Sequence, residues 1–130
     1  MITIDDLALA AKEMGLDPVV DSESESLTVV YEMSTVICAY NDERHTLSVA
    51  ILNKCGVPEE EREMELLRCN RLNEMIAVGK GFIDADGNEL LIYQSKVFQD
   101  GYVRELLGDG LGCVARMKSL YIRLTIDFSK

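Results

Sequence analysis

Two short segments carry residue types that could hold an ion or a phosphate. The first, Asp-Ala-Asp-Gly-Asn-Glu at 84–89, is similar to part of a calcium-binding loop. An EF-hand loop needs Gly at its sixth position and an acidic residue at its twelfth, whereas here Gly87 is fourth and Ser95 would be twelfth. An Asp-Gly turn between two apolar runs explains the segment without a metal, because Gly takes positive φ at little cost. We therefore predict a hairpin turn and no metal site.

The second segment, Gly-Asp-Gly-Leu-Gly at 108–112, is similar to the glycine loops that bind nucleotides. Such loops join a strand to a helix, so that backbone N–H groups and the helix dipole meet the phosphate. This segment instead follows an amphipathic helical pattern and lacks the Lys-Ser/Thr pair of a P-loop. Asp109 would also repel a phosphate. We therefore predict no nucleotide and no other cofactor.

The residues that most often perform acid–base or nucleophilic catalysis are scattered along the chain. His45 is the only histidine and lies in a polar run typical of an exposed turn, with nothing to orient it. The glutamates of 59–65 crowd one segment, which is typical of a solvated helix face. Four cysteines are widely spaced and form no zinc-binding pattern, which favours buried thiols in a reducing compartment: Cys38, Cys55, Cys69 and Cys113. We expect no catalytic residues and no enzyme activity.

The polar residues that stand out are Asn70 and Asn73, because Asn is a poor helix former and these two share one side of a predicted helix. We expect them to bond either to the following strand or to a partner backbone, with ordinary surface amides as the alternative. Five residues form the predicted apolar face of this helix: Met64, Leu67, Leu72, Met75 and Ile76. Leu66 and Cys69 fall outside this face and widen the apolar arc of the helix. A wide apolar arc indicates deep burial or contact with a partner chain. We therefore predict a partner-binding or dimer surface at Leu66, Cys69, Asn70 and Asn73.

The elements that must position these residues follow from the spacing of apolar residues. Helical spacing predicts a first helix at 4–14 with Thr3 as its cap, a second from Pro58 to Ile76, and a long third from Gly101 with Asp100 as its cap. The third helix runs through its glycines, which let another element approach closely, and residues 120–128 fit either helix or strand. Residues 21–26 read as a loop, and alternation predicts strands at 27–33, 36–40, 47–52, 78–84 and 89–94. The order is α-β-β-β-α-β-β-α: one α+β domain spanning 1–130, with an antiparallel sheet of about five strands packed with helices.

Composition limits the function further. The chain has 130 residues, 48% hydrophobic and 28% charged, with a net charge of −10 and a pI near 4.5. Such acidity argues against a nucleic-acid partner. No apolar run approaches the roughly 18 residues of a membrane span, and the first charges are acidic, which favours a soluble protein in the cytoplasm. Residues 1–65 carry 15 acidic and 4 basic side chains, and residues 66–130 carry 8 and 9, so we expect partner contacts to favour the balanced second half or to set it against an acidic face.

The stretch from Leu67 to Gly101 resembles the YbjN-like family of small bacterial proteins. The matching motifs are Asn70-Arg71-Leu72-Asn73, Gly79-Lys80-Gly81-Phe82, Asp84-Ala85-Asp86-Gly87-Asn88 and Leu91-Ile92-Tyr93. The resemblance implies the fold that this family shares with class I type III secretion chaperones, which are also small, acidic and dimeric. It implies a non-enzymatic binding module, proposed in the family to be a regulator, and carries over no catalytic residues.

We therefore expect a polypeptide-binding or regulatory module that forms a homodimer and captures an extended or helical segment at a sheet edge or an apolar groove. Two alternatives remain open. One is a type III secretion chaperone that holds an effector segment. The other is a small-molecule sensor or an enzyme of unrecognised type, which predicts a deep pocket with convergent polar groups.

Overall fold

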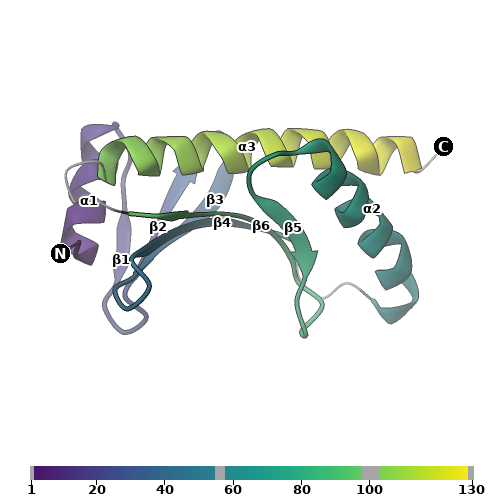
Figure 1. The fold of residues 1–130 in the computed structure, drawn as a ribbon, viewed down its shortest axis with the longest axis horizontal. Helices are drawn as coiled ribbons and strands as arrows, with labels where there is room; N and C mark the ends of the chain where they lie inside the picture. Colours follow the sequence, from purple (N-terminus) through teal and green to yellow (C-terminus); the bar gives the residue numbers. More distant parts are fainter. Residues whose placement is uncertain (1, 55–57, 98–102, 129–130) are drawn as a thin grey trace.

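The computed structural model describes residues 2–54, 58–97 and 103–128 (Figure 1). Its elements in chain order are α1 (Ile4–Glu13), β1 (Val19–Asp21), β2 (Ser26–Tyr31), β3 (Ser34–Asn41), β4 (Thr46–Lys54), the short 3-10 helix η1 (Glu59–Glu61), α2 (Arg62–Met75), β5 (Lys80–Ile83), β6 (Glu89–Lys96) and α3 (Val103–Phe128). The predicted α+β class and the predicted order of helices and strands are confirmed, with one additional strand.

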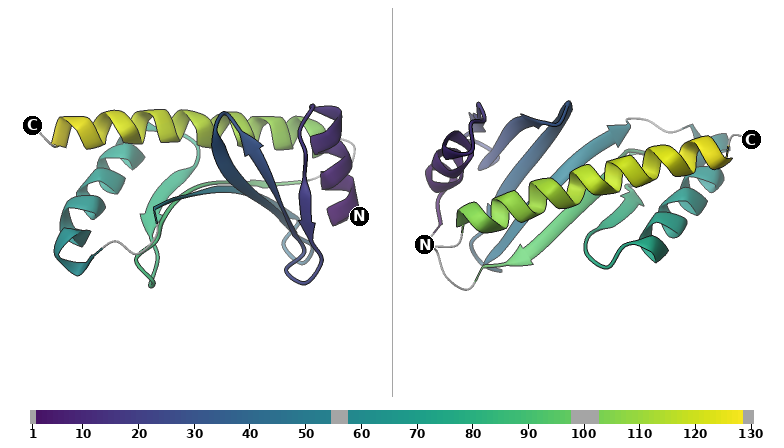
Figure 2. Two further views of the ribbon diagram at one scale, coloured as in Figure 1. Left: turned by 180° about the vertical axis from the view of Figure 1, so that it is seen from behind. Right: turned by 90° about the horizontal axis from the view of Figure 1, so that it is seen from above.

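The six strands form one antiparallel sheet in the order β1-β2-β3-β4-β6-β5. The sheet bows into an arch, with α3 lying along its convex side and α1 and α2 at its two ends (Figures 1 and 2). The core fills the space between the convex face and the helices. One row of this face runs across four strands and is buried throughout: Leu27, Cys38, Val49 and Tyr93.

The first helix begins where its local sequence predicts. The Thr3 hydroxyl accepts the Asp6 N–H at 3.2 Å, and the Asp6 carboxylate accepts the Thr3 N–H at 2.8 Å, which makes a complete capping box. At the other end Gly15 takes φ +83°, a left-handed conformation that glycine adopts without a Cβ clash. These signals depend on residues a few positions apart, so the sequence contains all of them.

The third helix runs unbroken from Val103 to Phe128, so the ambiguous residues 120–128 are helical. A Cβ added at Gly110 would lie 2.7 Å from Val49 Cγ2 and 2.9 Å from Tyr93 Cδ1, so this glycine allows helix and sheet to approach closely. Gly108 and Gly112 have no such neighbour. The predicted start at Gly101 and cap at Asp100 lie outside the described residues.

The sheet has six strands where about five were predicted, because β1 was not recognised. Val19–Asp21 has three exposed residues and no alternation of burial, and it forms a strand only through pairing with β2, Val19 opposite Thr28.

The turn at 84–89 is the predicted hairpin. The Asp84 carboxylate accepts the N–H groups of Asp86 and Asn88 at 2.9 Å, and Gly87 takes φ +81°. These hydrogen bonds lower the pKa of Asp84, the one from Asn88 contributing most.

Within the residues that the structure describes, no helix combines the length and the apolar character needed to cross a bilayer.

Candidate partner-binding surface

The second helix is turned differently from the prediction. Leu72 faces inward as predicted, but Met64, Leu67 and Met75, which were predicted to lie on the same buried face, are 41%, 49% and 48% exposed. The inward positions are Glu65, Cys69 and Leu72, spaced by four and three residues. The predicted apolar face was therefore wrong for three of its five residues, because a glutamate lies on the buried side of the helix.

Glu65 is buried and takes part in polar contacts that involve three elements. Its carboxylate accepts hydrogen bonds from the Arg68 guanidinium on α2 and from the Tyr121 hydroxyl on α3. Glu89 of β6 is also buried, and the two carboxylates are 4% and 1% exposed. Burial raises the pKa of Tyr121 well above its ordinary value, and hydrogen bonds with Glu65 and Glu89 add to the rise. Charged and hydroxyl groups thus join α2 to the body of the protein.

Cys69 lies beside this cluster and is buried within its own chain. Burial raises the pKa of its thiol to about 11, and the negative charges of Glu89 and Glu65 add to the rise. A thiol with so high a pKa is protonated near neutral pH and is a poor nucleophile. Cys69 therefore has little exposed surface in the folded chain, and its place in the partner-binding set stays a prediction.

Asn73 bonds the following strand, one of the two arrangements that the sequence suggested. Its amide nitrogen donates to the Gly81 carbonyl at 3.0 Å, and its amide oxygen accepts the Gly81 N–H at 2.8 Å. Gly81 belongs to β5, which is an outer strand of the sheet. The side chain therefore occupies backbone groups that another strand would need. The remaining two predicted residues, Leu66 and Asn70, are exposed on α2.

The opposite edge of the sheet has a different character. β1 is the outer strand there, and all three of its residues are exposed, including the large apolar Val19 and Val20. No strand within the described part of the chain pairs with its outer side. An unpaired edge presents backbone N–H and C=O groups to another chain. The two edges therefore differ: β5 is capped by Asn73 and β1 is open.

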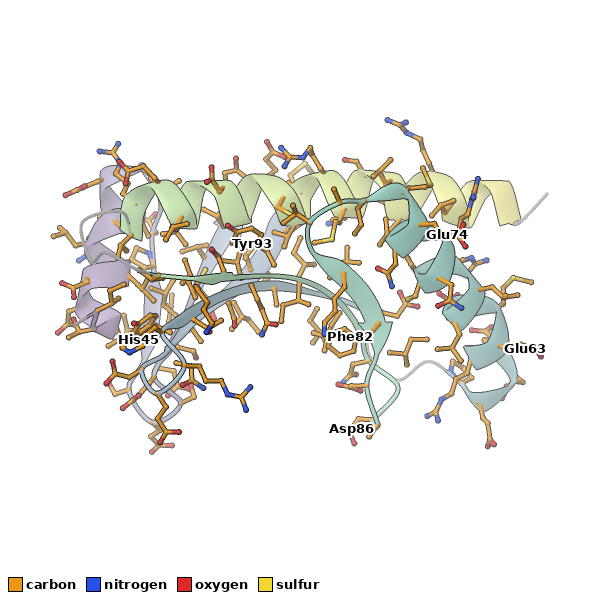
Figure 3. The ribbon with its side chains drawn as sticks, in the orientation of Figure 1. His45, Glu63, Glu74, Phe82, Asp86 and Tyr93 are labelled. Atoms are coloured by element: carbon orange, nitrogen blue, oxygen red, sulfur yellow. The ribbon has the colours of Figure 1, made fainter. Side chains whose placement is uncertain are left out.

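Part of the concave face of the sheet is apolar, and no helix among the described residues covers it (Figures 1 and 2). From β2 to β5 the strand register sets four rows on this face. Two are mostly apolar: Thr28, Ile37, Ala50, Ile92 and Lys80, then Val30, Thr35, Leu52, Leu90 and Phe82. The other two are polar apart from Ala39: Ser26, Ala39, Ser48 and Gln94, then Asn41, Thr46 and Lys96. We define the open sheet face as the six large apolar residues of these rows: Val30, Ile37, Leu52, Phe82, Leu90 and Ile92. Figure 3 shows Phe82 pointing into the hollow of the arch and Tyr93 pointing toward α3.

The sequence carries one signal for this surface. The strand at 36–40 is apolar at both alternating sets of positions, so something must cover the sheet on at least one side. In the structure one set packs under the helices and the other set, with Ile37 40% exposed and the neighbouring Val30 65% exposed, faces outward. The signal was present, but the sequence did not show which face the helices cover.

The catalytic and ligand hypotheses gain little from the geometry. His45 is exposed, and its ring nitrogen lies 3.2 Å from the Tyr40 hydroxyl. No group of three or more His, Cys, Asp or Glu side chains within the described ranges is arranged to hold a metal ion. A hollow of about 500 Å³ lies beside α3, with Arg116 and Arg123 near Glu32 of the β2–β3 turn, but it is open to solvent. This hollow is not the deep pocket that a small-molecule sensor requires.

Comparisons with known proteins place the fold. No family model matches the sequence, and no curated protein matches it. Among solved structures, the chain is similar to YbjN from E. coli, a protein proposed to regulate transcription, with a TM-score of 0.70 and 9% identity over 89% of this chain and 88% of that one. It is also similar to SycH, a Yersinia pestis type III secretion chaperone solved in complex with a stable fragment of YscM2, with a TM-score of 0.50 and 19% identity over 89% of this chain and 97% of that one. The chain therefore has the YbjN-like, type III secretion chaperone-like fold, as its sequence motifs implied.

Proposed function

We propose that this chain is a non-enzymatic polypeptide-binding module that takes up an extended segment along β1. The observation that carries the proposal is the difference between the two sheet edges. Asn73 occupies the backbone of Gly81 on β5, whereas Val19–Asp21 on β1 is exposed and unpaired on its outer side within the described residues. A segment that adds to an open edge gains main-chain hydrogen bonds with little dependence on its sequence, and side chains beside the edge provide selectivity.

Val19 and Val20 flank this edge on opposite faces of the sheet, because their partners Thr28 and Leu27 do. An added strand would meet one valine on each face, so alternate apolar residues of the segment would be favoured. We therefore expect the bound segment to be extended and rich in β-branched or aromatic residues.

The fold likeness supports the same class of function. SycH was solved with a polypeptide fragment bound, and neither SycH nor YbjN is described as an enzyme. A narrower version of the proposal, in which the segment belongs to a secreted effector, rests on the likeness to SycH alone. We propose a cytoplasmic location with the binding function, in keeping with the free thiols at Cys38, Cys69 and Cys113.

We also propose that the chain forms a homodimer through α2. Met64, Leu67 and Met75 recur at helical spacing on its outer side and leave an apolar stripe in water, although α2 belongs to a strongly acidic chain. Exposed apolar stripes of this kind are typical of helices that contact a second chain.

The binding proposal can be tested with phage-displayed random peptides selected on the wild-type protein and measured by fluorescence anisotropy. Val19→Pro and Val20→Pro are compared, because successive N–H groups of a strand point to opposite edges. Proline at one of the two positions therefore removes only an N–H that points away from β2. The variant with proline at that position should keep its circular dichroism spectrum and bind the selected peptide about tenfold more weakly.

Asn73→Ala provides the matched control at the other edge. The substitution frees the N–H and C=O of Gly81, so the variant should bind a second equivalent of an extended peptide or self-associate through β5. The proposal is wrong if the wild type enriches no peptide, or if both proline variants bind the selected peptide as the wild type does.

A further inference from the structure

The open sheet face is large for a surface that contacts only water. Its six residues come from five adjacent strands, and Val30, Ile37 and Leu52 are each at least 40% exposed. Contiguous apolar surface on a small soluble protein marks a contact site more often than chance exposure does. The face is also concave, which suits a convex occupant such as a helix (Figure 1).

Among the strand residues on this side of the sheet, two are basic and one is acidic. Lys80 and Lys96 share its side of the sheet, since they lie opposite Ile92 and Thr46, and the Lys80 ammonium lies 5.5 Å from the centroid of the Phe82 ring. The acidic strand residue on the same side is Asp21, at the distant β1 edge. The chain carries a net charge of −10. An occupant with an apolar stripe and acidic flanks would therefore match both the surface and its lysines.

The second helix of the same chain has these properties. Met64, Leu67 and Met75 form its exposed apolar stripe, and Glu60 and Glu63 lie at helical spacing from the stripe at its acidic beginning. Figure 3 shows Glu63 on the outer side of α2, away from the sheet of its own chain. Its 14 residues make a helix about 21 Å long, comparable with the roughly 19 Å spanned by the four strand-to-strand spacings of the open sheet face.

We propose that the occupant of the open sheet face is α2 of a second copy of this chain. The inference rests on the homodimer proposed above and specifies its surfaces. α2 lies at the β5 end of the sheet, beside the concave side of the arch (Figure 1). A two-fold axis near β5 would therefore let each copy place its α2 stripe on the open sheet face of the other. Such a dimer is closed, because both copies use the same two surfaces and leave neither free.

The inference can be tested by light scattering on the full chain, whose dimer would have twice the monomer mass of 14.5 kDa. Leu67→Glu, on the α2 stripe, and Ile37→Lys, on the open sheet face, should each raise the dimer dissociation constant by about a hundredfold, because each buries a charge in an apolar contact. Leu9→Glu on the exposed side of α1 is the matched control and should leave the dimer unchanged.

Mixing the two variants gives the deciding measurement. A mixed dimer contains one unaltered helix–sheet contact and one in which the introduced carboxylate meets the introduced ammonium. The mixture should therefore recover the dimer, whereas a contact of α2 with α2, or of sheet with sheet, would not recover it. Should Ile37→Lys fail to fold by circular dichroism, Lys80→Glu replaces it and should weaken the wild-type dimer about fivefold.

The outcomes separate the inference from the proposals on which it rests. A wild type that is monomeric at every concentration overturns both the homodimer and these surfaces. A dimer that tolerates Leu67→Glu, or a pair of monomeric variants that do not recover on mixing, overturns the surfaces and leaves the homodimer. Peptide binding at β1 is measured separately and does not depend on either result.

Discussion

The helices at the two ends of the sheet are attached by different physical means. α1 buries apolar side chains alone, Leu7, Ala8, Ala10 and Ala11, and has a complete capping box. α2 buries Glu65 and Cys69 beside Leu72, leaves Met64 and Leu67 in water, and has no side-chain cap at its beginning. The first helix leaves one large apolar side chain exposed, Leu9. The second leaves several exposed, and the proposed dimer contact would bury them.

The contrast separates stability from recognition. An apolar contact such as that of α1 is insensitive to pH and salt, whereas the polar cluster under α2 depends on the protonation of several groups. Such a cluster is a weak source of stability, because the cost of taking its charges out of water offsets much of their attraction. The expected consequences of this difference can be measured, and three of them follow.

The largest effect should come from the apolar end. Leu7→Ala should lower the free energy of unfolding by about 3 kcal/mol in urea titrations, because it leaves a cavity where the side chain is fully buried. Leu9→Ala, on the exposed side of the same helix, should change it by less than about 0.5 kcal/mol. Similar costs for the two variants would show that α1 is not held by burial and would remove the contrast.

A smaller effect should appear at the polar end. Tyr121→Phe removes the hydroxyl that donates to Glu65 and should cost about 2 kcal/mol, because a buried carboxylate loses a donor. The double variant with Glu65→Gln should cost less than the sum of the two single variants, since Gln weakens and Phe removes the same hydrogen bond. Strictly additive costs would mean that Glu65 and Tyr121 do not stabilise the attachment of α2 together.

The third effect is a pH dependence of stability to which Cys69 on α2 contributes. The pKa of Cys69 is raised from 9.0 to about 11 in the folded chain, so its contribution is complete below pH 9 and is lost as the pH rises toward 11. Between about pH 8 and pH 10 the unfolded chain ionises first, and Cys69→Ala should remove about 1 kcal/mol of the resulting loss of stability. Cys38→Ala in β3 should remove a similar part of the loss, because burial raises the pKa of Cys38 to about 12. If Cys69→Ala loses as much stability as the wild type between pH 8 and pH 10, folding does not raise the pKa of Cys69.

The sequence predicted the features whose causes are local. The cap at Thr3, the turn at Gly87 and the alternation of β2, β3 and β4 all depend on residues within a few positions, and the structure confirms them. The long α3 was predicted because its apolar stripe outweighs the helical cost of its glycines, and close packing explains Gly110.

The features that the sequence could not predict depend on distant partners. Glu65 faces inward, where Tyr121, 56 residues later, donates to it, and the local sequence does not show this distant partner. β1 exists because β2 pairs with it, since three exposed residues carry no strand pattern of their own. Of the predicted partner-binding set, Asn73 and Cys69 are used inside the chain, while Leu66 and Asn70 remain on the surface.

The cap that Asn73 places on β5 also limits how the chain can polymerise. A sheet with two open edges can add a copy at each side and grow into a fibre of unlimited length. Here two copies that join by their edges can use only β1 against β1, which leaves a capped β5 at each end. The Asn73 amide, together with the packing of α2 against β5, therefore opposes edge-to-edge aggregation, and losing the amide should matter most where the protein is most concentrated.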